Sequence, residues 1–216
     1  MMCKSFCLAL FLAVIYISLA SVSSGASADR KDTKPYGELG GDREYIYEQF
    51  AEMNATMLIC MRNVIAKNQE LINRDPETGN YYFKGFVPAV VGSQVANDFS
   101  LRTGHMLKQT ALRVRNPKNK ADEWEEKALK ILEKDRTKEG FGEITDMGHK
   151  KAYRYMKPLY MEKECVMCHS VPEVMSPEVR EYIEKNYSTD KALGYKEGDL
   201  RGGISVIIPI TEKSLP

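Results

Sequence analysis

Residues 140–161 read GFGEITDMGHKKAYRYMKPLYM and predict two paired β-strands. The first run covers Gly140 to Thr145, and the second, Lys151 to Met161, is rich in tyrosine and methionine. Aromatic and β-branched residues favour strands, and two such runs close together in sequence favour a paired hairpin. Two further strands are predicted at Met106 to Val114 and at Ile204 to Ile210. The chain therefore predicts a mostly antiparallel sheet.

Helical patterns precede and interrupt these strands. The longest is capped by Asp42 and runs to about Asn73. Its apolar residues recur on one face at spacings of three and four, and they are Ile46, Phe50, Met53, Met57, Cys60, Val64 and Leu71. We expect this face, with Cys60 at its middle, to point inward. Further helices are predicted to start at Pro88, to span about Asp122 to Asp135, and to follow a cap at Ser176. Helices followed by strands with helices between them favour an α+β domain.

The composition is that of an ordinary globular protein. Of the 216 residues, 43% are hydrophobic and 28% are charged, which permits a real core and argues against wholesale disorder. The formal net charge of +1 lacks the basic excess of a nucleic-acid-binding surface, so we expect no nucleic acid partner.

Residues 1–28 have the features of a signal peptide. A positive charge precedes an apolar run from Phe6 to Ala20, and Ala26-Ser27-Ala28 has the small-x-small form that a signal peptidase accepts. The run is short for a membrane span. The alternative is an uncleaved anchor, which would tie the protein to the membrane. We expect export to the periplasm, a flexible lead-in over residues 29–41 and a single domain over residues 42–216.

One motif carries recognisable chemistry. Cys165-Val166-Met167-Cys168-His169 has the C-x-x-C-H spacing of covalent haem attachment. Two thiols reach the two vinyl groups at one edge of the porphyrin and form thioethers, and the adjacent histidine offers a neutral imidazole nitrogen to iron. Bacteria attach haem outside the cytoplasm, so the motif and the signal peptide support each other. A single motif predicts one covalently attached haem c.

Other uses of the cysteines remain open. Cys165 and Cys168 could form a disulfide, or they could join Cys60 and a histidine around zinc. Cys60 is the third cysteine outside the predicted signal peptide. It is either a buried small hydrophobe or a second axial ligand of the haem iron, across from His169.

Two arginines lie on the strand predicted at Met106 to Val114 or just after it. Arg113 and Arg115 alternate with apolar residues, and an arginine there could clamp a haem propionate through a bidentate contact. The alternative is a structural ion pair with Glu125 or another acid.

Three stretches together resemble the c-type-haem-binding PAS-like sensor domains. They are LRVRNPKN at 112–119 followed by Trp124-Glu125, YMKP at 155–158 ahead of the haem motif, and GYKEGDLRGGISV at 194–206. The resemblance implies a PAS-like fold with a long N-terminal helix packed on a central antiparallel sheet. It implies haem c with His169 as one axial ligand. In some members a cysteine on the N-terminal helix completes the coordination, and Cys60 lies at a matching place.

The resemblance favours a periplasmic sensor of redox state or of a diatomic gas. In this interpretation, reduction would displace a Cys60 thiolate and open the iron to the gas. No output domain follows Pro216, so we expect signalling to need a partner protein. The alternative is a soluble electron carrier that keeps two fixed axial ligands and meets a redox partner. No catalytic constellation stands out near the motif, so we expect no enzyme activity.

Overall fold

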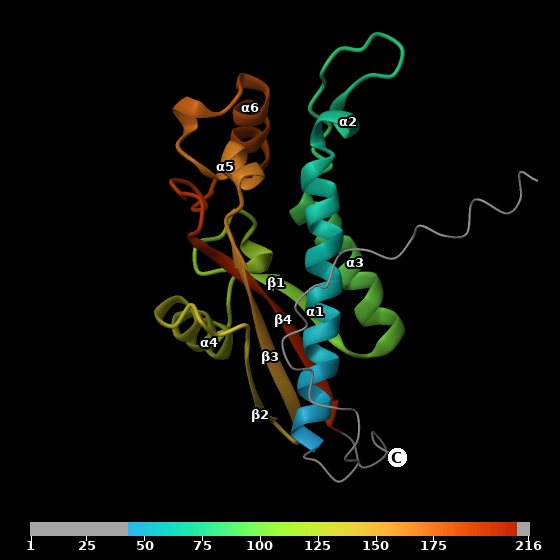
Figure 1. Ribbon diagram of the computed structural model, residues 1–216, viewed down its shortest axis with the longest axis vertical. Coiled ribbons are helices and arrows are strands. Elements are labelled where there is room, and N and C mark those ends of the chain that lie inside the picture. The colour runs from blue at the N-terminus through green and yellow to red at the C-terminus, as the bar shows by residue number, and fades with distance from the viewer. Residues whose placement is uncertain (1–42, 211–216) are drawn as a thin grey trace, which may run out of the picture. The chain divides into compact units, whose positions relative to one another are not determined.

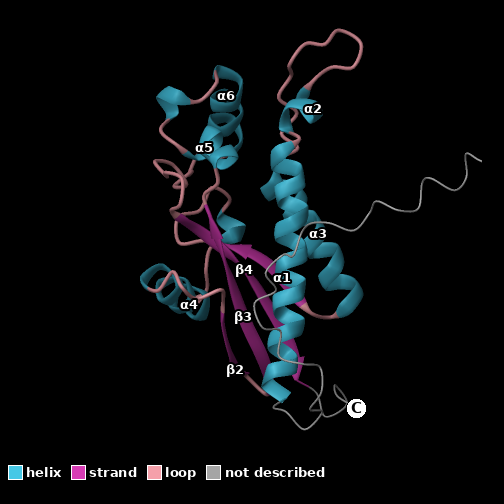
Figure 2. Ribbon diagram, in the orientation of Figure 1, coloured by secondary structure: helices cyan, strands magenta, loops and turns pink. Residues whose placement is uncertain are grey.

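The sheet is the centre of the fold in the computed structural model, which describes residues 43–210. It has four antiparallel strands in the order β1-β4-β3-β2 (Figures 1 and 2). The strands are β1 Met106–Thr110, β2 Phe141–Met147, β3 Lys150–Tyr160 and β4 Leu200–Ile210. The predicted signal peptide over 1–28 and lead-in over 29–41 lie outside the described residues and stay predictions.

The hairpin predicted from residues 140–161 is confirmed. β2 and β3 pair with Phe141 opposite Met156 and Met147 opposite Lys150. β1 is shorter than predicted, because the Ala111 amide donates to the Asn119 carbonyl over 3.1 Å and the chain then leaves the sheet. Placing Arg113 on a strand was therefore wrong, and both arginines lie in the segment that follows β1.

The predicted helices are present, and the structure adds a helix over the motif that the sequence did not predict. The helices are α1 Arg43–Lys67, α2 Gln69–Asn73, α3 Pro88–Thr103, α4 Glu123–Lys134, α5 Lys163–His169 and α6 Pro177–Asn186. The single long helix predicted to Asn73 is interrupted at Asn68, which separates α1 from α2. Ser176 caps α6, as predicted, by accepting a hydrogen bond from the Val179 amide. No helix within residues 43–210 is long and apolar enough to cross a membrane.

The strands alternate their side chains between two apolar layers, as the pleat of a sheet requires. On one face, Tyr153 and Tyr155 of β3 join the core cluster formed with α1 and α3. On the other face, Met156 packs with residues of α4. Figure 1 shows α1 and α3 on one side of the sheet and α4 on the other. This arrangement confirms the predicted PAS-like α+β class, a central antiparallel sheet with a long N-terminal helix and flanking helices.

The buried face of α1 differs from the predicted one. Its buried residues are Tyr47, Ala51, Ala55 and Leu58. The predicted stripe is largely exposed, including Phe50 at 51% and Met57 at 68%. The two alanines let the helix backbone lie close to the tyrosines of β3, which fill the space that larger helix side chains would need. The face of α1 that packs on the sheet is therefore determined by steric fit to the sheet rather than by which face has more apolar residues.

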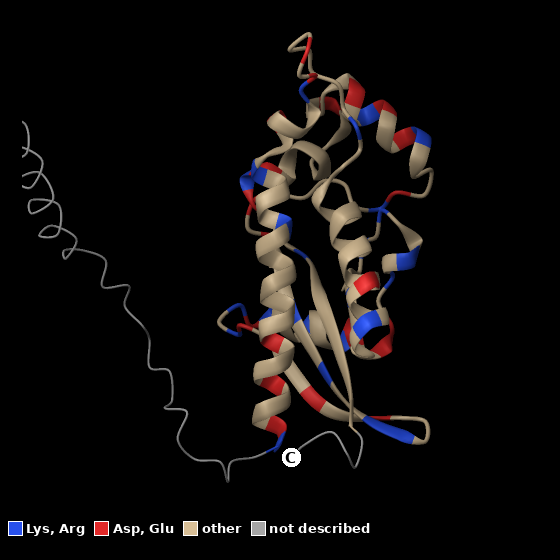
Figure 3. Ribbon diagram, turned by 90° about the vertical axis from the view of Figure 1, so that its right-hand side faces the viewer, with Lys and Arg blue, Asp and Glu red and all other residues tan. Residues whose placement is uncertain are grey.

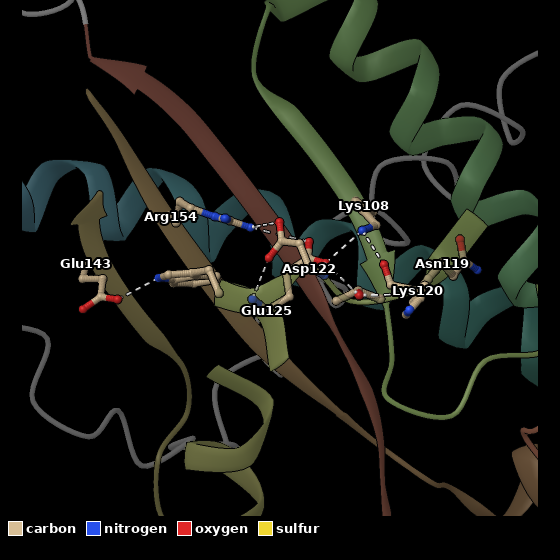
Figure 4. Close-up of polar contacts among 9 residues, drawn as sticks. Lys108, Asn119, Lys120, Asp122, Glu125, Glu143 and Arg154 are labelled. Carbon is tan, nitrogen blue, oxygen red and sulfur yellow. Dashed lines mark hydrogen bonds and ion pairs between the residues drawn. The ribbon is translucent and has the colours of Figure 1, made fainter. Parts of the chain in front are cut away.

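A buried carboxylate ties α4 to the sheet (Figure 4). Glu125 is 1% exposed, and its Oε2 accepts hydrogen bonds from Lys108 Nζ over 2.8 Å and from Thr110 Oγ1 over 3.0 Å. Glu125 also completes a capping box with Asp122, whose Oδ2 accepts from Arg154 Nη2 over 2.7 Å. These contacts connect α4 with β1 and β3, so the network fixes the helix on its face of the sheet.

The last two helices lie at the end of the sheet where β3 terminates. α5 follows β3 directly, and α6 buries Met175, Val179 and Ile183 in a small cluster of their own. Phe83, from the loop after α2, packs against this cluster and meets Tyr182 edge-on with ring centroids 5.1 Å apart. The segment that carries the haem motif is thereby connected to the α2 end of the N-terminal helices.

Candidate functional site

The motif residues share one short helix. α5 carries Cys165, Cys168 and His169, and a spacing of three places the two cysteines on the same side of the helix, one turn apart. Both thiols are free and partly buried. Cys165 packs against a cluster that contains Met161 and Tyr195, whereas Cys168 packs against the cluster buried by α6. Burial raises the pKa of both thiols, so they stay protonated at neutral pH.

His169 is held in one orientation by the backbone. Its Nδ1 lies 2.8 Å from the carbonyl oxygen of Ala192. Burial, followed by the charges of Arg201 and Arg115, lowers the pKa of His169 well below its usual value, so the ring is neutral at pH 7. A carbonyl only accepts hydrogen bonds, so Nδ1 carries the proton and Nε2 keeps its lone pair. A neutral imidazole held in this way suits ligation of a metal through Nε2.

Residues 190–195 wrap the C-terminal end of α5. The amide of Tyr195 donates to the His169 carbonyl over 3.0 Å, and the amide of Gly194 donates to the Ser170 carbonyl over 3.1 Å. The Tyr195 ring meets the His169 ring edge-on with centroids 6.3 Å apart. The GYKEGDLRGGISV stretch therefore supports the motif histidine as well as leading into β4.

Arg115 reaches the same end of α5. Its Nε donates to Asp190 Oδ2 over 2.8 Å, and the pair is largely buried. Its Nη2 donates to the carbonyl oxygen of Cys168 over 2.6 Å. Of the two roles considered from the sequence, the structural ion pair is the one seen, with Asp190 rather than Glu125 as the acid. Arg115 thus anchors the helix that carries the motif.

Arg113 also contacts the segment over residues 190–195. Its guanidinium lies 4.2 Å from the centre of the Tyr195 ring and donates to the carbonyls of Lys191 and Leu193. The arginine therefore stabilises the turn around Tyr195. Its donors are engaged with backbone carbonyls, and no acid pairs with it among the described residues.

Two partly buried arginines near the motif were missed in the sequence. Arg62 lies on α1 and donates to Gln109 of β1, and Arg201 begins β4 and donates to the Arg113 carbonyl over 3.0 Å. Burial lowers the pKa of Arg62 to about 10 and also lowers the pKa of Arg201. Neither forms an ion pair within residues 43–210, and Arg201 Nε is buried without a hydrogen-bond partner.

The positive charges of these two arginines could be neutralised by a bound anion. Burying a cation without a counter-charge costs several kcal/mol, so buried cations are normally paired. The sequence contains one indication of this positive charge. Leu58 follows Ala55 by three residues and Arg62 follows Leu58 by four, so Arg62 lies on the helix face that is buried.

Cys60 lies apart from this group. It is exposed on α1, and it follows the buried Ala51 by nine residues, or two and a half helical turns, so it is on the opposite side of the helix. The expectation that Cys60 points inward was therefore wrong. Within the described residues, no group of three or more histidine, cysteine or acidic side chains could hold a metal ion. The zinc ligands considered from the sequence, Cys60 with the motif residues, are not brought together.

Comparison with known proteins adds a family to this geometry. The model of the Tll0287-like family matches residues 43–209, which span the whole sheet and all the helices described above. The chain belongs to the Tll0287-like family. No curated protein matches it.

A solved structure supports the fold of this Tll0287-like protein. It is similar to the crystal structure of the cyanobacterial haem protein Tll0287, with a TM-score of 0.61 and 22% sequence identity. The match covers 81% of this chain and 100% of that chain. The arrangement of α1, α3 and α4 around the antiparallel sheet is therefore a fold that a solved protein also adopts.

Proposed function

We propose that this protein binds one haem c, attached through Cys165 and Cys168 and ligated by His169. The observation that carries the proposal is the orientation of His169, whose Nδ1 is bonded to Ala192 while Nε2 is left for iron. The similarity to a protein described as a haem protein supports it. Haem would supply a one-electron redox couple and an iron coordination position open to a small ligand.

The chain's own residues fit such a group. Both motif thiols are partly buried against apolar side chains, which suits addition to the vinyl edge of a porphyrin. Arg62 and Arg201 are partly buried near the motif and form no ion pair among the described residues, and two haem propionates would provide negative charges for them. The orphaned Arg201 Nε is the donor that most needs such a partner.

The charge of these arginines leads to a prediction. Arg62→Gln and Arg201→Gln should each lower the reduction potential, because ferric haem carries one more positive charge than ferrous haem and nearby cations disfavour it. Spectroelectrochemical titration measures the potential. Arg201→Lys should retain much of the wild-type value, and Arg102→Gln, at an exposed ion pair on α3, should leave it unchanged. Potentials that stay the same in both glutamine variants would remove the arginines from the site.

We assign the protein to sensing of redox state or of a diatomic gas in the periplasm, with a signalling partner to relay the response. Support comes from a direct connection between the motif and the long helix. Asn63 of α1 donates to Glu162, the residue that precedes α5, over 3.2 Å, and Arg62 lies one residue earlier. A shift of α5 on ligand exchange would act on α1 through these residues, and α1 is long enough to carry the shift away.

One observation favours electron transfer as the alternative. Met167, Val171 and Val174 are 49%, 44% and 66% exposed and lie on or just after α5. Exposed apolar residues beside a redox centre are typical of the surfaces on which electron carriers meet their partners. A carrier would keep the same axial ligands in both oxidation states.

One experiment separates the two functions. Optical and electron paramagnetic resonance spectra of purified holoprotein are followed through reduction and after addition of carbon monoxide, with Cys60→Ala measured in parallel. A sensor should bind carbon monoxide when reduced and change its ligation. If Cys60 stays as exposed in the holoprotein as it is here, its variant should give wild-type spectra. A fixed low-spin spectrum that resists carbon monoxide would favour the carrier, and a thiolate signal lost in Cys60→Ala would restore Cys60 as an axial ligand.

A further inference from the structure

The amide of Gln109 lies in a slot between β1 and α3. Gln109 is on β1 and is 6% exposed, and its Nε2 donates to the carbonyl oxygen of Ala89 and to Ser93 Oγ, both over 2.8 Å. Ala89 and Ser93 belong to the first two turns of α3. Both amide hydrogens are therefore used by α3, which fixes the orientation of the amide and leaves Oε1 as its acceptor.

A glycine on α3 makes room for this amide. Gly92 is buried in the helix interior, where glycine is less favourable than alanine. Its φ does not lie in the left-handed region, so the backbone does not require a glycine here. A methyl group at this position would lie 2.8 Å from Gln109 Oε1 and 3.1 Å from its Nε2, closer than side chains normally approach. The glycine is therefore explained by the close approach of the Gln109 amide.

The remaining acceptor of Gln109 holds Arg62. Gln109 Oε1 accepts a hydrogen bond from Arg62 Nη1, which connects β1 to α1. Between Glu52 and Arg62 the helix has no charged residue, as Figure 3 shows for its middle portion, so no acid lies one turn before Arg62 to hold its guanidinium. Among the described residues, the contact with Gln109 is the one hydrogen bond of the Arg62 side chain. An arginine has many rotamers, so this contact determines where its charge lies.

We propose that Gln109 is a positioning residue that fixes the charge of Arg62 beside the haem. The inference rests on the proposed function, in which a haem propionate neutralises Arg62. Arg62 is near enough to Cys165 and Arg201 for their charges to interact, so it belongs to the surroundings of the motif. With Nη1 engaged by an amide that α3 holds in place, the other N–H donors of the guanidinium remain for an anion. Gln109 acts on the haem only through Arg62.

The test is a double-mutant cycle on the reduction potential of the holoprotein, measured by spectroelectrochemical titration. Gln109→Met removes the amide and keeps the length of the side chain, so the Arg62 guanidinium should move away. Moving a cation from about 6 to about 8 Å from another charge, at an effective dielectric constant of about 20, alters an equilibrium constant about threefold. The potential should fall, with reduction about threefold less favourable. In the Arg62→Gln background, Gln109→Met should change nothing further. Equal shifts in both backgrounds, or no shift in either, would overturn the proposal.

Gly92→Ala is a second variant, and it removes neither the charge nor the amide. The added methyl group should push the amide out of its slot, because the atoms it meets are the end of the flexible Gln109 side chain. Alanine favours the helix, so the fold should be kept while the potential falls as in Gln109→Met. Asn97→Ala is the matched control, a helix-favouring change at an exposed position of α3, and should leave the potential unchanged. A wild-type potential in Gly92→Ala, or an equal fall in Asn97→Ala, would refute the positioning role.

Haem content separates this inference from the proposed function. Wild-type protein that carries no covalent haem would refute the proposed function and this inference with it. Haem-loaded protein whose potential is the same in Gln109→Met, Gly92→Ala and the wild type would refute the inference alone. If Gln109→Met does not fold, as judged by far-UV circular dichroism, Gly92→Ala in the wild-type and Arg62→Gln backgrounds completes the cycle.

Discussion

A Cys165→Ala, Cys168→Ala variant is expected to lose covalently bound haem completely. In the proposed function these two thiols bond to the porphyrin, and both lie on one side of α5. Cells that express the protein with a haem-attachment system should yield wild-type protein that retains haem peroxidase staining after denaturing electrophoresis. The double variant should give none, although its His169 can still bind haem non-covalently and weakly.

Cys60→Ala is the matched control for this loss. Cys60 lies on the outer side of α1, so its removal should leave the stained band at wild-type strength. Wild-type protein that carries no haem but contains zinc, or a disulfide between the motif cysteines, would contradict the proposed function. Staining that survives in the double variant would show attachment at some other residue.

A Glu125→Ala variant is expected to be about 3–5 kcal/mol less stable than the wild type. Glu125 is almost completely buried, accepts hydrogen bonds from Lys108 and Thr110, and closes the capping box with Asp122. Its removal leaves Lys108 without its carboxylate partner and takes away one of the two carboxylates near Arg154, which keeps Asp122. The free energy of unfolding from urea titration, monitored by far-UV circular dichroism, measures the loss.

Glu123→Ala separates this network from a general effect of charge. Glu123 lies in the first turn of the same helix and is exposed, so its loss removes a favourable interaction with the helix dipole worth about 0.3–1 kcal/mol. A Glu125→Ala variant that loses no more stability than Glu123→Ala would show that the buried contacts contribute little. The slope of the urea transition should be unchanged in both, since neither substitution alters the surface exposed on unfolding.

The same network shows where local sequence reasoning succeeds. The helix over residues 122–135 was predicted from its apolar period, and α4 begins after Asp122 and ends at Lys134. The cap contacts lie within three residues of each other, so they are encoded locally. The partners of Glu125 on β1 and the stacking of Arg154 over Trp124 at 4.5 Å come from strands far away in sequence. No spacing rule predicts them.

The candidate site likewise contains residues that the sequence identified and residues that only the fold brings together. Cys165, Cys168 and His169 share a five-residue motif, so the sequence identified them together. Arg62 and Arg201 come from α1 and the start of β4, and only the packing of the helix on the sheet brings their charges to the motif. Arg115 was recognised as a candidate, but its neighbour Asp190 is 75 residues away, and that contact turned a possible ligand clamp into an anchor for α5.

By itself the sequence determined the C-x-x-C-H motif, the α+β class, the hairpin and the cap of α6, because each depends on neighbouring residues and on the repeat of a helix or strand. The tertiary structure alone decided which side of α1 is buried. The pattern correctly gave a long apolar stripe, yet the sheet carries Tyr153 and Tyr155, and only a helix face with Ala51 and Ala55 fits closely against two such rings. Packing between segments far apart in the sequence determines which face of α1 is buried. With that face buried, Cys60 and its apolar neighbours are exposed to solvent.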